Sequence, residues 1–301
     1  MAFAAFISQS ALADVRINDF GIRNLNFGSW TGGGGVELTQ AFCVESVEGR
    51  RNRSVDTRPY SLEIARRDAN SGFYLEGPEG NLPFELQFID LRTRSVELMR
   101  EGIATALDKT GAAQRCRTEG NNAAVQINFQ QADLQNAAAG RYRSRFQVLA
   151  RGGSNGTETH RLNNITLSFA VDALIAVNKL DDLQLLFQPG GGDVSAVEEL
   201  CVYQNGGSSF NLSVSSQAQA PFTLEGDTGA VPYRLRWRDE LGELALSDET
   251  IFRGRRIDRA GGLTCQGGNN AALLLDIAAE DAASAGSGRY RDTIVIRVSP
   301  E

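Results

Sequence analysis

The residue types that most often carry enzyme chemistry are scarce in this sequence of 301 residues. His160 is the single histidine, so a Ser-His-Asp triad would have to use it and a multi-histidine metal site is excluded. Glu76 and Glu225 recur in two matching Leu-Glu-Gly turns, and such a recurrence is better explained by a repeated fold than by one active site. The glycines at 32–35 lack the Lys and Ser/Thr of a phosphate-binding loop. We therefore expect no enzymatic activity, no cofactor and no metal.

Composition and the N-terminus indicate an exported protein. A net charge of -7, from 30 Lys+Arg against 37 Asp+Glu, argues against nucleic acid as a partner. Residues 1–13 form a short apolar stretch that ends in Ala-Leu-Ala, a pattern that signal peptidase cleaves, although the positively charged start is missing. We expect residues 1–13 to be a truncated signal peptide; a buried N-terminal helix is the alternative.

Four cysteines are the remaining candidates for chemistry. They lie far apart, without a C-x-x-C pair, which argues against zinc binding and redox catalysis. An even number of cysteines in an exported β-rich protein predicts two disulfides, most simply Cys43 with Cys116 and Cys201 with Cys265. Each bond would contribute about 4 kcal/mol by closing a long loop. The alternative is four buried free thiols.

An internal repeat determines the domain organisation. The pattern that begins Phe-x-Leu-Glu-Gly occupies 73–86 and returns without a gap at 222–235, 149 residues later. Gly-Asn-Asn-Ala-Ala occurs at 120–124 and 268–272, and each copy is followed by Gly-Arg-Tyr-Arg. Self-similarity of this length predicts two copies of one domain.

Strand-like alternation fills both copies. Apolar residues recur at every second position, as strands with one buried face require. The matched sets are Tyr60, Leu62, Ile64 with Phe210, Leu212, Val214; Phe84, Leu86, Phe88 with Tyr233, Leu235, Trp237; and Val125, Ile127, Phe129 with Leu273, Leu275, Ile277. Short strands separated by Gly and Asn turns predict an all-β fold of two tandem immunoglobulin-like β-sandwich domains. Regions 93–110 and 238–262 stay unassigned.

The two copies differ after their last matched strand. The first copy continues into an alternating run, Ile165, Leu167, Phe169, Val171, Ala173, Ile175 and Val177, whereas the sequence ends at Glu301 soon after the second. We predict that strand 162–177 completes a first domain of residues 14–177. The second domain, 178–301, then lacks its final strand and exposes a groove beside Ile294, Ile296 and Val298. The alternative is that the same segment completes the second domain and leaves the first open.

Several motifs carry a resemblance to a known family. They are Leu-Asn-Phe-Gly at 25–28, Cys-Val at Cys43 and Cys201, the Leu-Glu-Gly turn, the second cysteine of each copy, and the terminal Gly-x-Tyr-x-Asp-Thr pattern of 288–300. The chain thereby resembles the spore coat protein U family, the subunits of archaic (Csu-type) chaperone-usher pili. The second copy departs at its start, with Leu-Leu-Phe-Gln at 185–188. The first departs at its end, with Ser144-Arg145 where the second has Asp292-Thr293.

The resemblance implies assembly by donor-strand complementation, in which a neighbouring subunit supplies the missing strand. Val15, Ile17 and Asp19 form a poor donor that the first domain needs as its own opening strand, so the chain resembles a two-domain tip adhesin. The implied role is adhesion to surfaces and biofilm formation at the pilus tip, after secretion through the periplasm. The implied partners are a periplasmic chaperone, an outer-membrane usher, an adjacent pilin and an abiotic or host surface. A non-adhesive structural or secreted subunit of this family is the alternative.

Two aromatic residues are candidates for the adhesive surface. Trp30 precedes a glycine run. Tyr74 is expected on the opposite face of its strand from Phe73 and Leu75. Exposed aromatics on loops supply a large contact area. Sandwich topology would place the turn at 151–160 at the far end of the first domain, beside the connection 72–80. The alternative is that both aromatics pack against their own domain.

Overall fold

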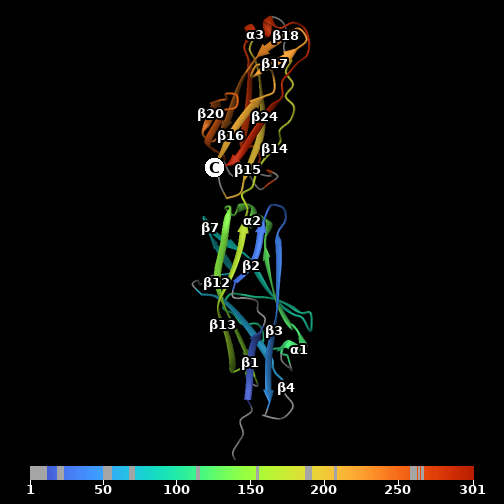
Figure 1. Cartoon of the computed structure of the whole chain (residues 1–301), viewed down its shortest axis with the longest axis vertical. Coiled ribbons are helices and arrows are strands. Elements are labelled where there is room, and N and C mark those ends of the chain that lie inside the picture. The colour runs from blue at the N-terminus through green and yellow to red at the C-terminus, as the bar shows by residue number, and fades with distance from the viewer. Residues whose placement is uncertain are drawn as a thin grey trace, which may run out of the picture. The chain divides into compact units, whose positions relative to one another are not determined.

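The computed structural model describes residues 12–18, 24–49, 56–67, 72–112, 116–153, 156–186, 192–206, 209–257, 263, 265 and 268–301. The chain divides into two compact units, Met1–Asp172 (unit 1) and Ala173–Glu301 (unit 2). Both are built from strands, with only short helices among the described residues: α1 (Cys116–Glu119), α2 (Gln131–Asn136) and α3 (Ala279–Ser284) (Figure 1). The all-β prediction is confirmed. Most of the predicted signal peptide, residues 1–11, lies outside the described residues.

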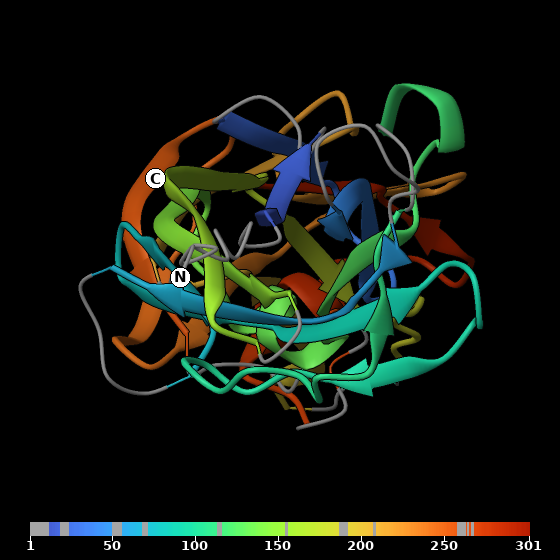
Figure 2. The ribbon, with the colours of Figure 1, turned by 90° about the horizontal axis from the view of Figure 1, so that it is seen from below.

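Unit 1 contains two sheets. The first has the order β1-β3-β11-β8-β9, from β1 (Leu12–Asn18), β3 (Val36–Gly49), β11 (Ala123–Phe129), β8 (Glu85–Asp90) and β9 (Val96–Leu98), with β4 (Asp56–Thr57) beside β3. The second has the order β10-β5-β12-β13-β2, from β10 (Lys109–Thr110), β5 (Pro59–Arg66), β12 (Gly140–Gly152), β13 (Glu158–Val171) and β2 (Asn24–Trp30). The hairpin of β6 (Tyr74–Gly77) and β7 (Gly80–Pro83) joins β12. Helix α1 lies outside these strands, at the margin (Figure 2).

Unit 2 repeats most of this arrangement. Its largest sheet has the order β14-β15-β22-β19-β20, from β14 (Ile175–Asn178), β15 (Val194–Gln204), β22 (Ala271–Ile277), β19 (Arg234–Asp239) and β20 (Gly242–Ala245). A second sheet has the order β21-β16-β24, from β21 (Ile251–Arg256), β16 (Ser209–Ser216) and β24 (Ile294–Pro300). The third joins β18 (Gly229–Pro232), β17 (Thr223–Gly226) and β23 (Tyr290–Arg291). The predicted repeat is thus a repeat of strand order.

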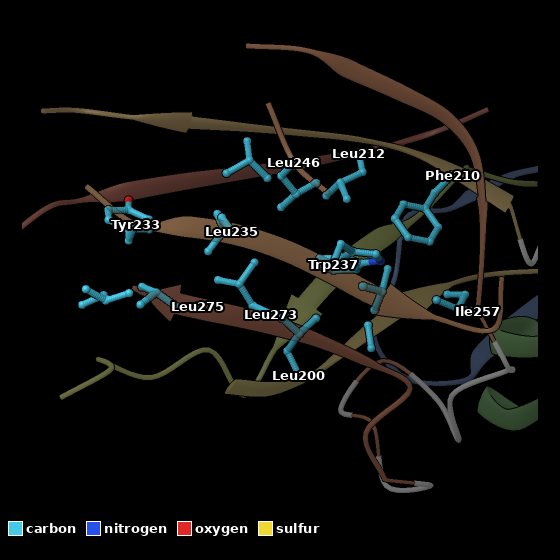
Figure 3. Close-up of a cluster of buried hydrophobic side chains, with 14 of the residues drawn as sticks. Leu200, Phe210, Leu212, Tyr233, Leu235, Trp237, Leu246, Ile257, Leu273 and Leu275 are labelled. Carbon is cyan, nitrogen blue, oxygen red and sulfur yellow. The ribbon is translucent and has the colours of Figure 1, made fainter. Parts of the chain in front are cut away.

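The alternating residues form the core of each unit, as predicted. Leu62 on β5 and its counterpart Leu212 on β16 are fully buried. In unit 2 the side chains of Leu212, Leu235 and Leu273 point toward one another between the sheets (Figure 3). The period of two that favours strands in the sequence is therefore also the period of burial.

The predicted domain boundary is wrong by a few residues. Strand β13 begins at Glu158 and ends at Val171, and the units divide between Asp172 and Ala173. The end of the alternating run forms β14, which pairs with β15 as the opening strand of unit 2. One continuous pattern of alternation therefore serves two strands in two units. The unassigned regions contain β9 and β10 in unit 1, and β20 and β21 in unit 2.

Candidate functional site

The two units differ at one strand. In unit 1, β12 has neighbours on both sides, β5 and β13, and β13 in turn pairs in parallel with β2. In unit 2 the equivalent strand β24 pairs with β16 on one side. Among the described residues no strand pairs with its other edge. A row of backbone N–H and C=O groups is thus available for pairing with an extended segment.

Apolar side chains line this free edge. They are Ile175 and Val177 of β14, Leu185, and Ile294, Ile296 and Val298 of β24; all six are half-buried against the core of unit 2, and we call them the open seam. Their counterparts on β1 and β12 of unit 1 are fully buried: Val15, Ile17, Phe146, Val148 and Ala150. Since β13 lies against both β1 and β12, its side chains account for the difference. Leu186, beside the seam, is 97% exposed.

The predicted completing strand of unit 1 is in place for four of its five residues. Ile165, Leu167, Phe169 and Val171 are buried, and Phe169 stacks on Phe129 with ring centroids 4.8 Å apart. Each such side chain contributes about 1.5 to 3 kcal/mol when buried, so β13 supplies an energy similar to the whole stability of a domain, about 5 to 15 kcal/mol. The prediction is wrong for Ala173, which is exposed and belongs to unit 2.

A polar cluster lies inside the open seam. Asp292 Oδ2 accepts hydrogen bonds from Tyr233 Oη (2.5 Å) and Ser216 Oγ (2.6 Å), and its Oδ1 accepts one from the Ala218 N–H (3.2 Å). Burial, followed by the hydrogen bond to Asp292, raises the pKa of Tyr233 above its usual range. The Tyr233 phenol is therefore the donor of the bond and the Asp292 carboxylate is the acceptor.

The same places in unit 1 hold a different set. Ser144 replaces Asp292 and accepts a hydrogen bond from the Glu76 N–H at 3.2 Å. Phe84 replaces Tyr233, and Arg66 replaces Ser216. The buried Arg66 guanidinium forms an ion pair with Glu76 at 2.6 Å. In unit 2 the charged group, Asp292, thus accepts a hydrogen bond from the core residue Tyr233. In unit 1 the charged groups form an ion pair between Arg66 on β5 and Glu76 on β6.

Both predicted disulfides are confirmed. Cys43 is bonded to Cys116 and Cys201 to Cys265, with sequence separations of 73 and 64. An asparagine on the opening strand contacts each bond: Asn18 Nδ2 lies 3.4 Å from Cys116 Sγ, and Asn178 Nδ2 lies 3.5 Å from Cys265 Sγ. The disulfide and its asparagine are therefore part of the repeated unit.

The expectation that Trp30 is exposed is wrong. Its side chain is 3% exposed, and the indole Nε1 donates to the Gly34 carbonyl at 3.1 Å. Trp30 ends β2, which pairs with β13 at Val171. The loop of glycines after it folds back and satisfies the indole, so the large ring becomes core.

Tyr74 is half-buried, not fully exposed. The Arg66 guanidinium covers its ring, with Cζ 3.4 Å from the centroid. Strand β6 pairs with β12 at Arg143, near the Gly140 end, whereas the turn after β12 lies at the other end of that strand. The connection 72–80 and the turn at 151–160 are therefore at opposite ends of unit 1, contrary to the prediction.

Exposed apolar residues occur where the sequence pattern assigned nothing. Within the described part of unit 1, every large hydrophobic side chain that is exposed falls in one segment: Leu91, Val96, Leu98, Ile103 and Leu107. We call these residues the apolar rim. The segment hydrogen-bonds to β8 through Met99 and to β5 through Gly102 and Thr105, so it crosses from one sheet to the other. No periodicity marks it, and only its composition could have suggested it.

The two residues of the apolar rim on β9 have no large apolar counterpart in unit 2. Val96 and Leu98 pair with Ile89 and Gln87 on β8. At the equivalent edge of unit 2, Glu243 and Ala245 pair with Arg238 and Arg236. Arg236 forms ion pairs with Glu243 and, at 2.9 Å, with Asp276. The fold therefore does not require apolar residues at this edge.

His160 has a structural contact. It lies half-buried in β13, and its Nδ1 accepts a hydrogen bond from the Ile17 N–H at 3.1 Å. Within the described residues, no group of His, Cys, Asp and Glu could hold a metal ion. No helix of that part of the chain is long and apolar enough to span a membrane.

No family model matches the chain, and no curated protein matches it. It is similar to solved structures of low sequence identity. One is the CsuC–CsuE chaperone–tip adhesion subunit pre-assembly complex from archaic chaperone-usher Csu pili of Acinetobacter baumannii, at 10% identity and a TM-score of 0.49, covering 94% of this chain and 99% of that chain. Another is CfaE, the adhesive subunit of CFA/I fimbria of enterotoxigenic Escherichia coli, at 14% identity and a TM-score of 0.40, covering 92% of each chain. A third is the CupB6 tip adhesin from Pseudomonas aeruginosa, at 10% identity and a TM-score of 0.40, covering 96% of each chain.

Proposed function

We propose that this protein is the tip adhesin of a chaperone-usher pilus. In this proposal unit 2 is completed by a strand from an adjacent pilin, and unit 1, complete in itself, binds the surface. The observation that carries it is the contrast between β12, which pairs with β13, and β24, whose second edge is free among the described residues. Pairing with an added strand is a recurrent mode of protein recognition.

The position at the tip is supported by the opening strand of unit 1. Strand β1 pairs with β3 at every position from Leu12 to Asn18. Val15 and Ile17 are buried in unit 1, so this segment is not free to complete another subunit. We propose export through the periplasm, with a chaperone covering the open seam before the usher delivers the subunit. The two disulfides are compatible with an oxidising compartment.

The adhesive surface that we propose is the apolar rim. It replaces Trp30 and Tyr74, which are buried or covered by Arg66. Val96 and Leu98 are more than half exposed on an edge strand, a place where soluble proteins usually put charges. Apolar side chains in such a place favour contact with a hydrophobic surface. Attachment to abiotic surfaces and biofilm formation follow from this proposal.

Photo-crosslinking in assembled pili tests the completion of unit 2. A photoreactive amino acid is introduced at Ile296 on β24 or, as the matched control, at the equivalent Val148 on β12. We expect crosslinking at Ile296 to join this chain to a second polypeptide and crosslinking at Val148 to stay within the chain. Intramolecular products at both positions would contradict the proposal.

A further inference from the structure

The Tyr233–Asp292–Ser216 cluster lies where a completing strand must pass. Residues 292 and 144 occupy equivalent positions, and Ser144 pairs with Leu167 of β13. An antiparallel strand laid on β24 in the same register therefore places one inward side chain opposite Asp292. The next inward positions along that strand face Tyr290 and Ile294, as Phe169 and Ile165 face Tyr142 and Phe146 in unit 1.

In unit 1 the surroundings of Leu167 are apolar. It lines a small cavity of about 20 Å³ together with nine other residues: Leu25, Ile64, Phe84, Leu86, Val125, Ile127, Phe146, Val148 and Ile165. Ile165 lies on β13 and has no counterpart in the described part of unit 2; the counterparts of the others are apolar too, except that Tyr233 brings a hydroxyl to the place of Phe84. Asp292 brings a carboxylate beside it. The Tyr233 hydroxyl and the Asp292 carboxylate thus make one position of the open seam polar.

A leucine at that position would cover the carboxylate without bonding to it. Asp292 is half-buried in the open unit, and a strand laid in this register would cover more of its carboxylate. Removing water from a carboxylate oxygen without supplying a donor is unfavourable. A small hydroxyl side chain would replace the lost water with a hydrogen bond and leave room for the Tyr233 ring.

We propose that the strand that completes unit 2 carries Ser or Thr opposite Asp292 and apolar side chains at the two flanking inward positions. The cluster then rejects strands of the β13 type, including β13 of another copy of this chain, and so prevents incorrect pairing between copies. This inference rests on the proposed completion of unit 2. Selection against a wrong partner by an uncompensated polar group is a general source of specificity.

Two labelled peptides test the inference against the full chain. One has the β13 sequence from Thr159 to Val171, and the other is the same peptide with Leu167→Thr. The chain is refolded with each peptide, and binding is measured by fluorescence anisotropy. We expect the Leu167→Thr peptide to bind about tenfold more tightly, the scale of one hydrogen bond to a charged group. A Phe169→Asp peptide is the negative control.

A double variant of the chain provides the reciprocal test. Tyr233→Phe with Asp292→Ser reproduces the residues of unit 1 at these two positions, and we expect it to prefer the unmodified peptide. Asp292→Ser alone is the second variant if the pair fails to fold. If the wild-type chain and a folded variant showed the same preference between the two peptides, the proposed specificity would be overturned. If neither peptide binds a folded chain, the proposed completion of unit 2 itself is contradicted.

Discussion

Units 1 and 2 show how one strand changes the properties of the same sandwich. Both have an opening strand beside a long central strand, a disulfide, a Leu-Glu-Gly hairpin and a core of alternating residues. In unit 1, β13 buries the apolar residues of β1 and β12, whereas in unit 2 the equivalent residues remain half-buried. The core residues alone therefore do not complete the sandwich. The last strand is also needed, because it covers the apolar residues that lie at the edges of the two sheets.

The copies also differ on their outer faces. Unit 1 has the apolar rim at the β8–β9 edge, and unit 2 has ion pairs of Arg236 with Glu243 and Asp276 there. Exposed large apolar side chains occur on both units, but in the described part of unit 1 they all fall in the apolar rim, whereas in unit 2 they are spread from Leu180 to Ile251. In the function that we propose, unit 1 binds the surface and unit 2 takes part in assembly.

The largest expected effect is on the completing strand. Phe169→Asp places an unpaired charge between β12 and Phe129, at a cost of several kcal/mol. We expect calorimetry of the full chain to show the loss of the unit 1 unfolding transition. Leu186→Asp is the control, since this side chain is exposed, and it should leave both transitions in place. A stable unit 1 in the Phe169→Asp protein would show that β13 does not complete the domain.

Loss of either disulfide should lower the free energy of unfolding by a similar amount, but the two units should respond differently. Removing either bond by a pair of Cys→Ala changes costs about 4 kcal/mol in the chain-entropy estimate, because the loops have similar lengths. We expect the variant lacking Cys43–Cys116 to keep a folded unit 1 and the variant lacking Cys201–Cys265 to lose unit 2. Limited proteolysis followed by mass spectrometry reads out which unit is cut. Similar resistance of the two units would contradict the difference in their stability.

The apolar rim should affect attachment and leave assembly unchanged. Val96→Ser with Leu98→Ser removes two exposed side chains from an edge strand, and we expect attachment of piliated cells to polystyrene to fall several-fold. Leu241→Ser with Ile251→Ser is the matched control, because these residues are equally exposed on unit 2. Pilus number is counted by electron microscopy. An equal loss in both variants would remove the distinction between the two surfaces.

The smallest expected effect is a change in the stability of unit 2 at alkaline pH, with no equivalent change in unit 1. Burial raises the pKa of Tyr203 to about 12, from about 10 in an unfolded chain. Because the neutral phenol is favoured in the fold, its contribution is complete below pH 10 and is lost as the pH rises toward 12. The equivalent residue of unit 1 is Glu45, which accepts a hydrogen bond from the Cys116 N–H. Tyr203→Phe should therefore reduce the alkaline loss of stability in unit 2 alone, measured by denaturant unfolding at pH 9 to 12.

Local patterns in the sequence were sufficient for much of this fold. The repeat, the alternating strands and the two disulfides could all be predicted, and so could the edge of β24 that is free among the described residues. A period of two is a property of a single strand with one buried face, and two copies of the same pattern confirm each other. The burial of Ile165, Leu167, Phe169 and Val171 follows from that pattern alone.

Tertiary structure decided the places where a local pattern has two solutions. The alternation from Ile165 to Val177 is continuous, and only the partners β12 and β15 divide it between the units. Trp30 lies next to glycines that suggest an exposed loop, but the parallel pairing of β2 with β13 carries it into the core. The apolar rim has no period, because exposed residues on an edge obey no packing rule. At these positions, burial depends on what distant segments bring to a residue, and the sequence near that residue does not contain this information.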